Sequence, residues 1–103
     1  MWAQLISTRI KAGKDGELSN LFEQLHAVEQ PDSGLLRSLA FRDQKDPSRL
    51  HMLVVFEGEA KARAREADPR RAEGLDGVRA TMAEVFDGPP EFTDLVVVDD
   101  FTP

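Results

Sequence analysis

The chemistry that this chain can offer rests on a few polar side chains, because it contains neither cysteine nor tyrosine. His26 and His51 are its only histidines, and so the only side chains whose ordinary pKa suits a base near neutral pH. Gln4 and Thr8 are polar positions on one face of an alternating, otherwise apolar segment, where they could line a cavity and orient a ligand. Neither metal-ligand spacing nor a phosphate-binding glycine motif occurs, so no metal site is predicted.

Residues 58–74, GEAKARAREADPRRAEG, hold five of the thirteen cations in a chain whose net charge is −6. Four carboxylates lie in the same segment, which reduces its net charge to +1. Glu59 precedes Arg63 by four residues, a favourable spacing for an ion pair on a helix. Glu66 and Arg70 have the same spacing. The segment is therefore predicted to begin with a charge-paired covering helix. Its core-facing stripe is predicted to consist of Ala60, Ala64 and Ala67.

The segments that must position these side chains follow the order β-α-β-β-α-β. Alternating or continuous apolar runs predict strands, and apolar residues at helical spacing predict helices. The predicted strands are 2–11, 35–43, 50–57 and 92–99, and the predicted helices are 16–30, 59–67 and a segment from Asp68-Pro69 to just before Gly88. This order predicts one α+β domain over residues 1–103, with a ferredoxin-like, four-stranded antiparallel sheet and helices on one face.

Two of the predicted strands are apolar on both faces. LHMLVVF, residues 50–56, and LVVV, residues 95–98, have apolar side chains at nearly every position. Helices can cover only one face of the sheet, and a monomer would expose the other as a large apolar patch. The pattern therefore predicts a homodimer in which two sheets pack face to face with two-fold symmetry.

Composition narrows the class of protein. An acidic balance argues against a nucleic-acid partner, which normally needs a basic face. The apolar runs are far shorter than a membrane span, so no membrane association is predicted. The first residues lack the pattern of a signal peptide, and the chain has no cysteine, so we expect a cytoplasmic protein.

Five short motifs lie in order along the chain. They are KAGK at Lys11–Lys14, PDSGL at Pro31–Leu35, R-D-x-x-D-P-x-R at Arg42–Arg49, FEGEA at Phe56–Ala60, and Asp68-Pro69. Their order and spacing over nearly the whole chain resemble the antibiotic biosynthesis monooxygenase-like domains of the dimeric α+β barrel superfamily. The resemblance implies that fold and a homodimer.

The resemblance also implies a class of chemistry. Such domains include oxygenases that need no cofactor and act on phenols, quinols or anthrones. A base deprotonates the substrate, and the electron-rich anion then reacts with oxygen. We therefore expect a small apolar or anionic aromatic ligand between sheet and helices, and no cofactor. A non-catalytic ligand-binding or assembly module, and an isomerase or cyclase on the same fold, remain the alternatives.

The resemblance assigns roles to particular residues. Arg65 stands on the short helix where relatives often carry a functional histidine, so it could bind the anionic form of a ligand or simply belong to a solvated cover. Phe56 stands where the family usually has a tryptophan, and it joins Gln4 and Thr8 as a ligand-binding candidate. His26 is the candidate base, although its position on the predicted helix also fits a solvent-facing side chain.

Haem degradation is not expected. The haem-degrading branch of the family uses an asparagine on the first strand, a tryptophan on the short helix and a histidine on the long helix. By ungapped spacing these places hold Ile6, Arg65 and Leu75.

Overall fold

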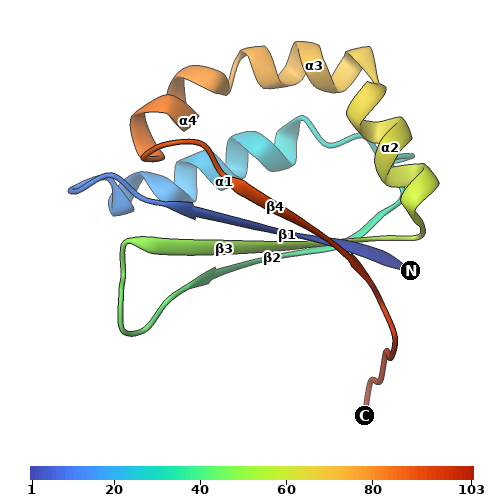
Figure 1. Ribbon diagram of the computed structural model, residues 1–103. Coiled ribbons are helices and arrows are strands. Elements are labelled where there is room, and N and C mark those ends of the chain that lie inside the picture. The colour runs from blue at the N-terminus through green and yellow to red at the C-terminus, as the bar shows by residue number, and fades with distance from the viewer.

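The protein folds as one layer of helices over one antiparallel sheet (Figure 1). The computed structural model describes residues 1–103. The strands are β1 (Trp2–Arg9), β2 (Leu35–Arg42), β3 (Arg49–Phe56) and β4 (Glu91–Val96). The helices are a 3-10 turn η1 (Asp15–Glu17), α1 (Leu18–Ala27), α2 (Glu59–Ala67), α3 (Pro69–Asp76) and α4 (Arg79–Val85). No helix has both the length and the apolar character that a membrane crossing requires.

The sheet confirms the predicted ferredoxin-like topology. Its strand order is β2-β3-β1-β4, and every neighbouring pair is antiparallel. Trp2 lies opposite Phe56, and Thr8 lies opposite Leu50, so these pairs share a face of the sheet. That face is the one covered by the helices, as the alternation in β1 predicted.

The core divides into two clusters along the covered face. The larger is formed by Ile10, Leu21, Leu50, Val78 and Val85. The smaller is formed by Trp2, Val54, Phe56 and Ala62. In the smaller cluster the Trp2 and Phe56 rings are tilted, with their centroids 6.1 Å apart. The smaller cluster supports α2, and it therefore fixes where the cationic side chains of that helix lie.

The stripe predicted for the helix over 59–67 was wrong. The buried alanine is Ala62, which is only 2 % exposed, whereas Ala60, Ala64 and Ala67 are exposed. Any of the alternating alanines could have faced inward on spacing alone. The smaller cluster selects Ala62 by packing, and because Ala62 and Arg65 are three residues apart, they share a face of the helix.

Several predicted boundaries also differ; for example, the first helix, predicted over 16–30, is a 3-10 turn followed by α1, which ends at Ala27. The helix after Pro69 is interrupted at Gly77 and Val78, so it forms α3 and α4 instead of one continuous helix. Glycine has a low helix propensity, which favours a break at this position. β4 ends at Val96 instead of residue 99, since Val96 lies opposite Trp2 near the start of β1. Beyond that pair, only the bond from Val97 N–H to the Met1 carbonyl continues the pairing.

The opposite face of the sheet carries no helix (Figure 1). In register, its apolar positions include Leu5 on β1, Leu39 and Phe41 on β2, and Leu53 on β3. The tail that follows β4 leaves the sheet on this same side (Figure 1). Two apolar side chains of the tail, Val98 and Phe101, are 94 % and 78 % exposed.

Candidate functional site

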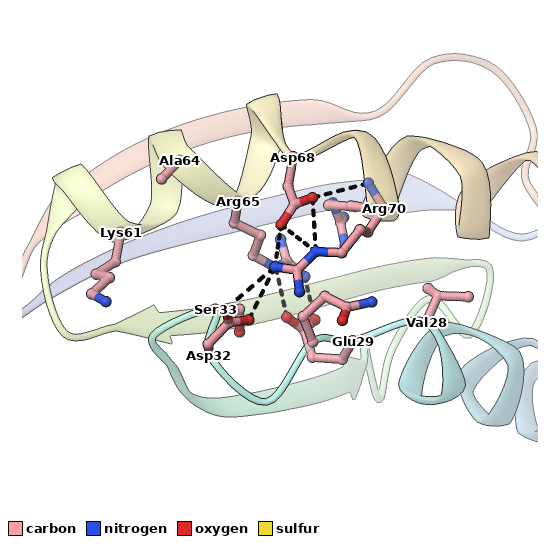
Figure 2. Close-up of a pocket in the computed structure, with 11 residues that line it drawn as sticks. Val28, Glu29, Asp32, Ser33, Lys61, Ala64, Arg65, Asp68 and Arg70 are labelled. Atoms are coloured by element: carbon pink, nitrogen blue, oxygen red, sulfur yellow. Dashed lines mark hydrogen bonds and ion pairs between the residues drawn. The ribbon is translucent and has the colours of Figure 1, made fainter.

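A polar pocket of about 150 Å³ lies between the α1–β2 loop and the helices α2 and α3. Its wall includes four cations and three carboxylates, so its lining has a net charge of +1 in an acidic protein. Figure 2 shows Arg65 reaching from α2 toward Glu29, Asp32 and Ser33 of the facing loop, while Lys61, also on α2, lies to one side. The pocket joins the end of the first helix to the segment 58–74, which are far apart in sequence.

Arg65 is held in the pocket wall by two kinds of contact. Its Nε and Nη2 donate to the two carboxylate oxygens of Glu29 at 2.9 and 2.7 Å. Its guanidinium carbon also lies 5.2 Å from the centre of the Phe56 ring. The two charged side chains are only 15 % and 21 % exposed, so this is a largely desolvated, bidentate ion pair stacked on an aromatic ring.

The environment of Glu29 lowers its pKa. Burial by itself raises the pKa, but hydrogen bonds from Arg65 and Ser33 and the charges of Arg65 and Arg71 outweigh that effect. Glu29 is therefore ionised at neutral pH and is a weak base. This carboxylate, which supports Arg65, gave no signal in the sequence, because its partner lies 36 residues away.

A second ion pair crosses the mouth of the pocket. The Arg70 guanidinium contacts Asp68 at 2.7 Å and Asp32 at 3.2 Å (Figure 2). The predicted pair between Glu66 and Arg70 was wrong: Glu66 contacts Arg63 instead, at 3.2 Å. The reason is that α2 ends at Ala67 and Asp68 has an extended backbone, so helical spacing does not continue to Arg70. Asp68 instead caps α3 by accepting a hydrogen bond from the backbone N–H of Arg70.

Arg71 differs from its neighbours because its side chain has no partner. It lines the pocket and is partly buried, yet it makes no side-chain hydrogen bond or ion pair. Burial, followed by the neighbouring charge of Arg65, lowers its pKa from the usual arginine value. Lys61, at the edge of the pocket, is also without an ion-pair partner. The pocket therefore has unpaired positive charge available to a ligand.

Gln4 takes part in a separate polar cluster on the other side of α2. Its amide donates to Asp94 of β4 at 3.0 Å, and Arg63 donates to the other oxygen of the same carboxylate at 2.8 Å. These hydrogen bonds, with that from Gln4 the stronger influence, lower the pKa of Asp94. The Arg63 guanidinium also lies 5.1 Å from the centre of the Trp2 ring. This cluster ties α2 to the edge strand β4, and none of its members lines the pocket.

No family model matches the sequence, and no curated protein matches it. Several solved structures, however, match the fold of this chain. A putative antibiotic biosynthesis monooxygenase from Bordetella bronchiseptica superposes with a TM-score of 0.76 at 18 % identity, covering 94 % of this chain and 96 % of the other. Another putative antibiotic biosynthesis monooxygenase, from Nitrosomonas europaea, superposes with a TM-score of 0.73 at 15 % identity, and the match covers 96 % of this chain and 100 % of the other. SnoaB, a cofactor-independent oxygenase from Streptomyces nogalater, superposes with a TM-score of 0.74 at 13 % identity, and the match covers 99 % of this chain and 97 % of the other.

The chain has the fold of the antibiotic biosynthesis monooxygenase proteins. This confirms the resemblance on which the sequence analysis relied. At identities below 20 % the likeness extends to the fold, and the chemistry has to be argued from the side chains of this chain.

The two histidines, His26 and His51, lie on different elements of this fold, and neither is in the pocket. His26 is exposed on α1 and does not line the pocket. His51 lies on the helix-free face of the sheet, and its Nδ1 is 2.9 Å from the hydroxyl of Ser7. The structure therefore brings neither histidine to Arg65.

Thr8 occupies the position that the alternation predicted, on the covered face of β1. It is buried, and its hydroxyl oxygen has no hydrogen-bond partner. Gln24 of α1 has a buried side-chain oxygen that also lacks a hydrogen-bond partner. Such groups are uncommon in folded proteins, and each is a potential contact for a water molecule or a polar ligand.

The residues present do not fit haem. Ile6 packs against the smaller core cluster, and Arg65 is paired with Glu29. Leu75, at the third position of the haem-degrading pattern, offers no nitrogen to iron. No three histidine, aspartate or glutamate side chains are grouped so that they could hold a metal ion.

Proposed function

We propose that this protein is a small-molecule-binding protein that works as a homodimer, and that its ligand is anionic. The observation that carries the proposal is the Arg65 guanidinium, which is largely buried between Glu29 and the ring of Phe56 in the wall of a pocket. A largely desolvated guanidinium in a pocket wall suits an anionic ligand. The ring of Phe56 is only 2 % exposed and does not line the pocket, so it supports Arg65 from behind. Cytoplasmic location stays a prediction from the cysteine-free sequence.

The homodimer is supported by the helix-free face of the sheet. Leu39, Phe41 and Leu53 lie on that face in register, and the apolar tail leaves the sheet on the same side. A second copy packed sheet to sheet would cover the face and give Val98 and Phe101 an apolar surface to contact.

A screen of aromatic carboxylates and phenolates by thermal shift, followed by calorimetric titration, tests the ligand proposal. Arg65→Ala is expected to weaken binding by about 1.5–3 kcal/mol, the usual range for a hydrogen bond to a charged group. The variant also leaves the carboxylate of Glu29 unpaired in the pocket, which repels an anion.

Arg79→Ala is the matched control, because Arg79 is exposed on α4 and pairs only with Asp76. It is expected to bind like the unmodified protein. Equal affinities of the Arg65 and Arg79 variants would contradict the proposed site. Arg63 would be a poor control, since it also holds Asp94 and covers Trp2.

Cofactor-independent oxygenation of an electron-rich aromatic is the second candidate function. The observation in its favour is the buried, unpartnered hydroxyl of Thr8 on the covered face, which could donate to the oxygen of a phenolate, although Thr8 does not line the polar pocket. SnoaB, which is described as a cofactor-independent oxygenase, shares the fold. We rank this function second because Glu29 is a weak base and His26 lies outside the pocket.

A further inference from the structure

We propose that the pocket between the α1–β2 loop and α2 and α3 recognises a phosphate group, with Arg71 as its principal contact. The inference rests on the proposed function, since it names the anionic group that the ligand carries. It starts from the uneven pairing of the four pocket cations. Arg65 and Arg70 already contact carboxylates, whereas Arg71 and Lys61 contact none.

Arg71 is poorly placed for a purely structural role. Its guanidinium is partly buried and lies near Arg65, and both conditions disfavour the charge. The charges of Glu29 and Glu66 favour it, but the net effect still lowers the pKa of Arg71, so the folded protein disfavours this cation when no group forms a hydrogen bond with it. An anion bound in the pocket would supply the missing partner.

The remaining donors surround the pocket from several sides. Arg65 uses Nε and Nη2 for Glu29, and its Nη1 makes no hydrogen bond. Arg70 likewise engages Asp68 and Asp32 through Nε and Nη2 alone. A carboxylate has two oxygens, which one guanidinium fork can saturate, whereas a phosphate group offers three or more acceptors to donors from different directions.

Lys61 is positioned at the pocket edge by a close contact with Gly34. A Cβ built on Gly34 would lie 2.7 Å from Cβ and 2.8 Å from Cγ of Lys61, so the lysine stem rests directly on the backbone of the α1–β2 loop. Gly34 also has a φ of +80°, a conformation that favours glycine. The contact therefore fixes the stem of Lys61 at the edge of the pocket.

The size of the pocket limits the group that enters it. The pocket has a volume of about 150 Å³. That space admits a phosphate headgroup but is smaller than the ~300–1,000 Å³ of a typical drug-sized ligand site. The ring of a larger ligand would therefore remain outside this pocket.

Inorganic phosphate is the probe for the first test. We expect phosphate to raise the thermal unfolding midpoint of the protein at constant ionic strength, with sodium chloride as the balancing salt. Arg71→Ala should weaken phosphate binding about 10-fold or more, the factor that corresponds to the loss of one charged hydrogen bond. The same variant should raise the midpoint without phosphate, because it removes an unpaired, partly buried charge.

Those opposite changes separate a binding role from a structural one. A lower midpoint of Arg71→Ala without phosphate would overturn the proposal, because it would mean that Arg71 stabilises the fold. Arg71→Lys should recover part of the phosphate response, and Arg79→Ala should retain all of it. An equal effect of malonate, a small dicarboxylate, would overturn the assignment to phosphate.

Amide chemical shifts would locate the bound anion. Phosphate should perturb signals of residues 29–33 and 61–71, and leave those of the crevice around Ala12 and Pro47 unchanged. The absence of localised shifts would overturn the proposal. If aromatic carboxylates still bound in an Arg65-dependent manner, the proposed function would stand while the phosphate inference failed. If neither phosphate nor aromatic carboxylates bound, both the proposed function and the phosphate inference would be refuted.

Discussion

The guanidinium groups of α2 and α3 illustrate how context separates residues of one type. Arg63 joins α2 to β4 through Asp94, and Arg65 joins α2 to the end of α1 through Glu29. Arg70 links α3 to the loop before β2. Arg71 joins nothing, although it is adjacent to Arg70 in the chain. Three of these arginines thus form ion pairs between elements, and the fourth, Arg71, forms none.

Replacing Glu29 tests the energetic role of the desolvated pair. Because folding lowers the pKa of Glu29 from its ordinary value of 4.5, its stabilising contribution is complete above that value. The contribution is lost as the pH falls below 4.5 through the lowered pKa of the folded state. Glu29→Gln should therefore reduce the free energy of unfolding at pH 7 by about 1–3 kcal/mol, since Arg65 loses its partner.

Urea unfolding at pH 7 and again well below the ordinary pKa of glutamate would measure this contribution. The gap between Glu29→Gln and the unmodified protein should shrink at the acidic pH, where Glu29 becomes protonated in both states. Glu84→Gln, an exposed position on α4 without an ion pair, should unfold like the unmodified protein at both values. A gap that stays constant with pH would contradict the assignment.

At the scale of elements, close backbone approach decides how the helices sit over α1. A Cβ added at Gly74 of α3 would lie 2.8 Å from both Cβ and Cγ1 of Val28, at the end of α1. This contact sets the distance between α3 and α1. It also helps to fix the width of the pocket, because Val28 and Glu29 are neighbours in its wall.

Two glycine replacements separate packing from helix propensity. Gly74→Ala would gain up to ~1 kcal/mol from helix propensity, but the clash with Val28 should outweigh it and destabilise the protein by about 1–3 kcal/mol. Gly77→Ala is the control: its nearest neighbour would be 3.6 Å away, and its φ is −73°. Thermal unfolding should show a lower midpoint for the first variant alone. Equal midpoints would mean that α3 can move away from Val28 at no cost.

At the scale of the whole molecule, the helical layer covers only one side of the sheet (Figure 1). The larger core cluster and the smaller one both lie under the helices. The other face and the tail keep apolar side chains near solvent in a single chain. The proposed homodimer would resolve this imbalance, and it would leave the polar pocket on the helical side accessible.

Leu53→Lys tests the homodimer, because Leu53 lies on the helix-free face in register with Leu5 and Leu39. In a single chain the new lysine can reach solvent, so the fold should persist by circular dichroism, whereas a buried charge between two sheets should prevent association. Sedimentation at micromolar concentration should show a dimer for the unmodified protein and a monomer for the variant. Ala80→Lys, at an exposed site on α4, should remain dimeric. A monomeric unmodified protein would refute the proposal.

The sequence by itself determined the order of elements, the topology of the sheet and the faces of its strands. These features follow from periodicity, which depends on neighbours in the chain and therefore needs no knowledge of distant contacts. The alternation in β1 correctly placed Thr8 under the helices, and Asp68-Pro69 correctly marked the start of α3.

Only the tertiary structure decided which charges meet. Arg65 and Glu29 are 36 residues apart, and Arg63 and Asp94 are 31 apart, so no spacing rule connects them. Their pairing depends on how closely the helices cross, which packing at Gly74 and at Ala62 decides. In the same packing Arg71 forms no ion pair, while the neighbouring Glu29 and Asp68 pair with Arg65 and Arg70.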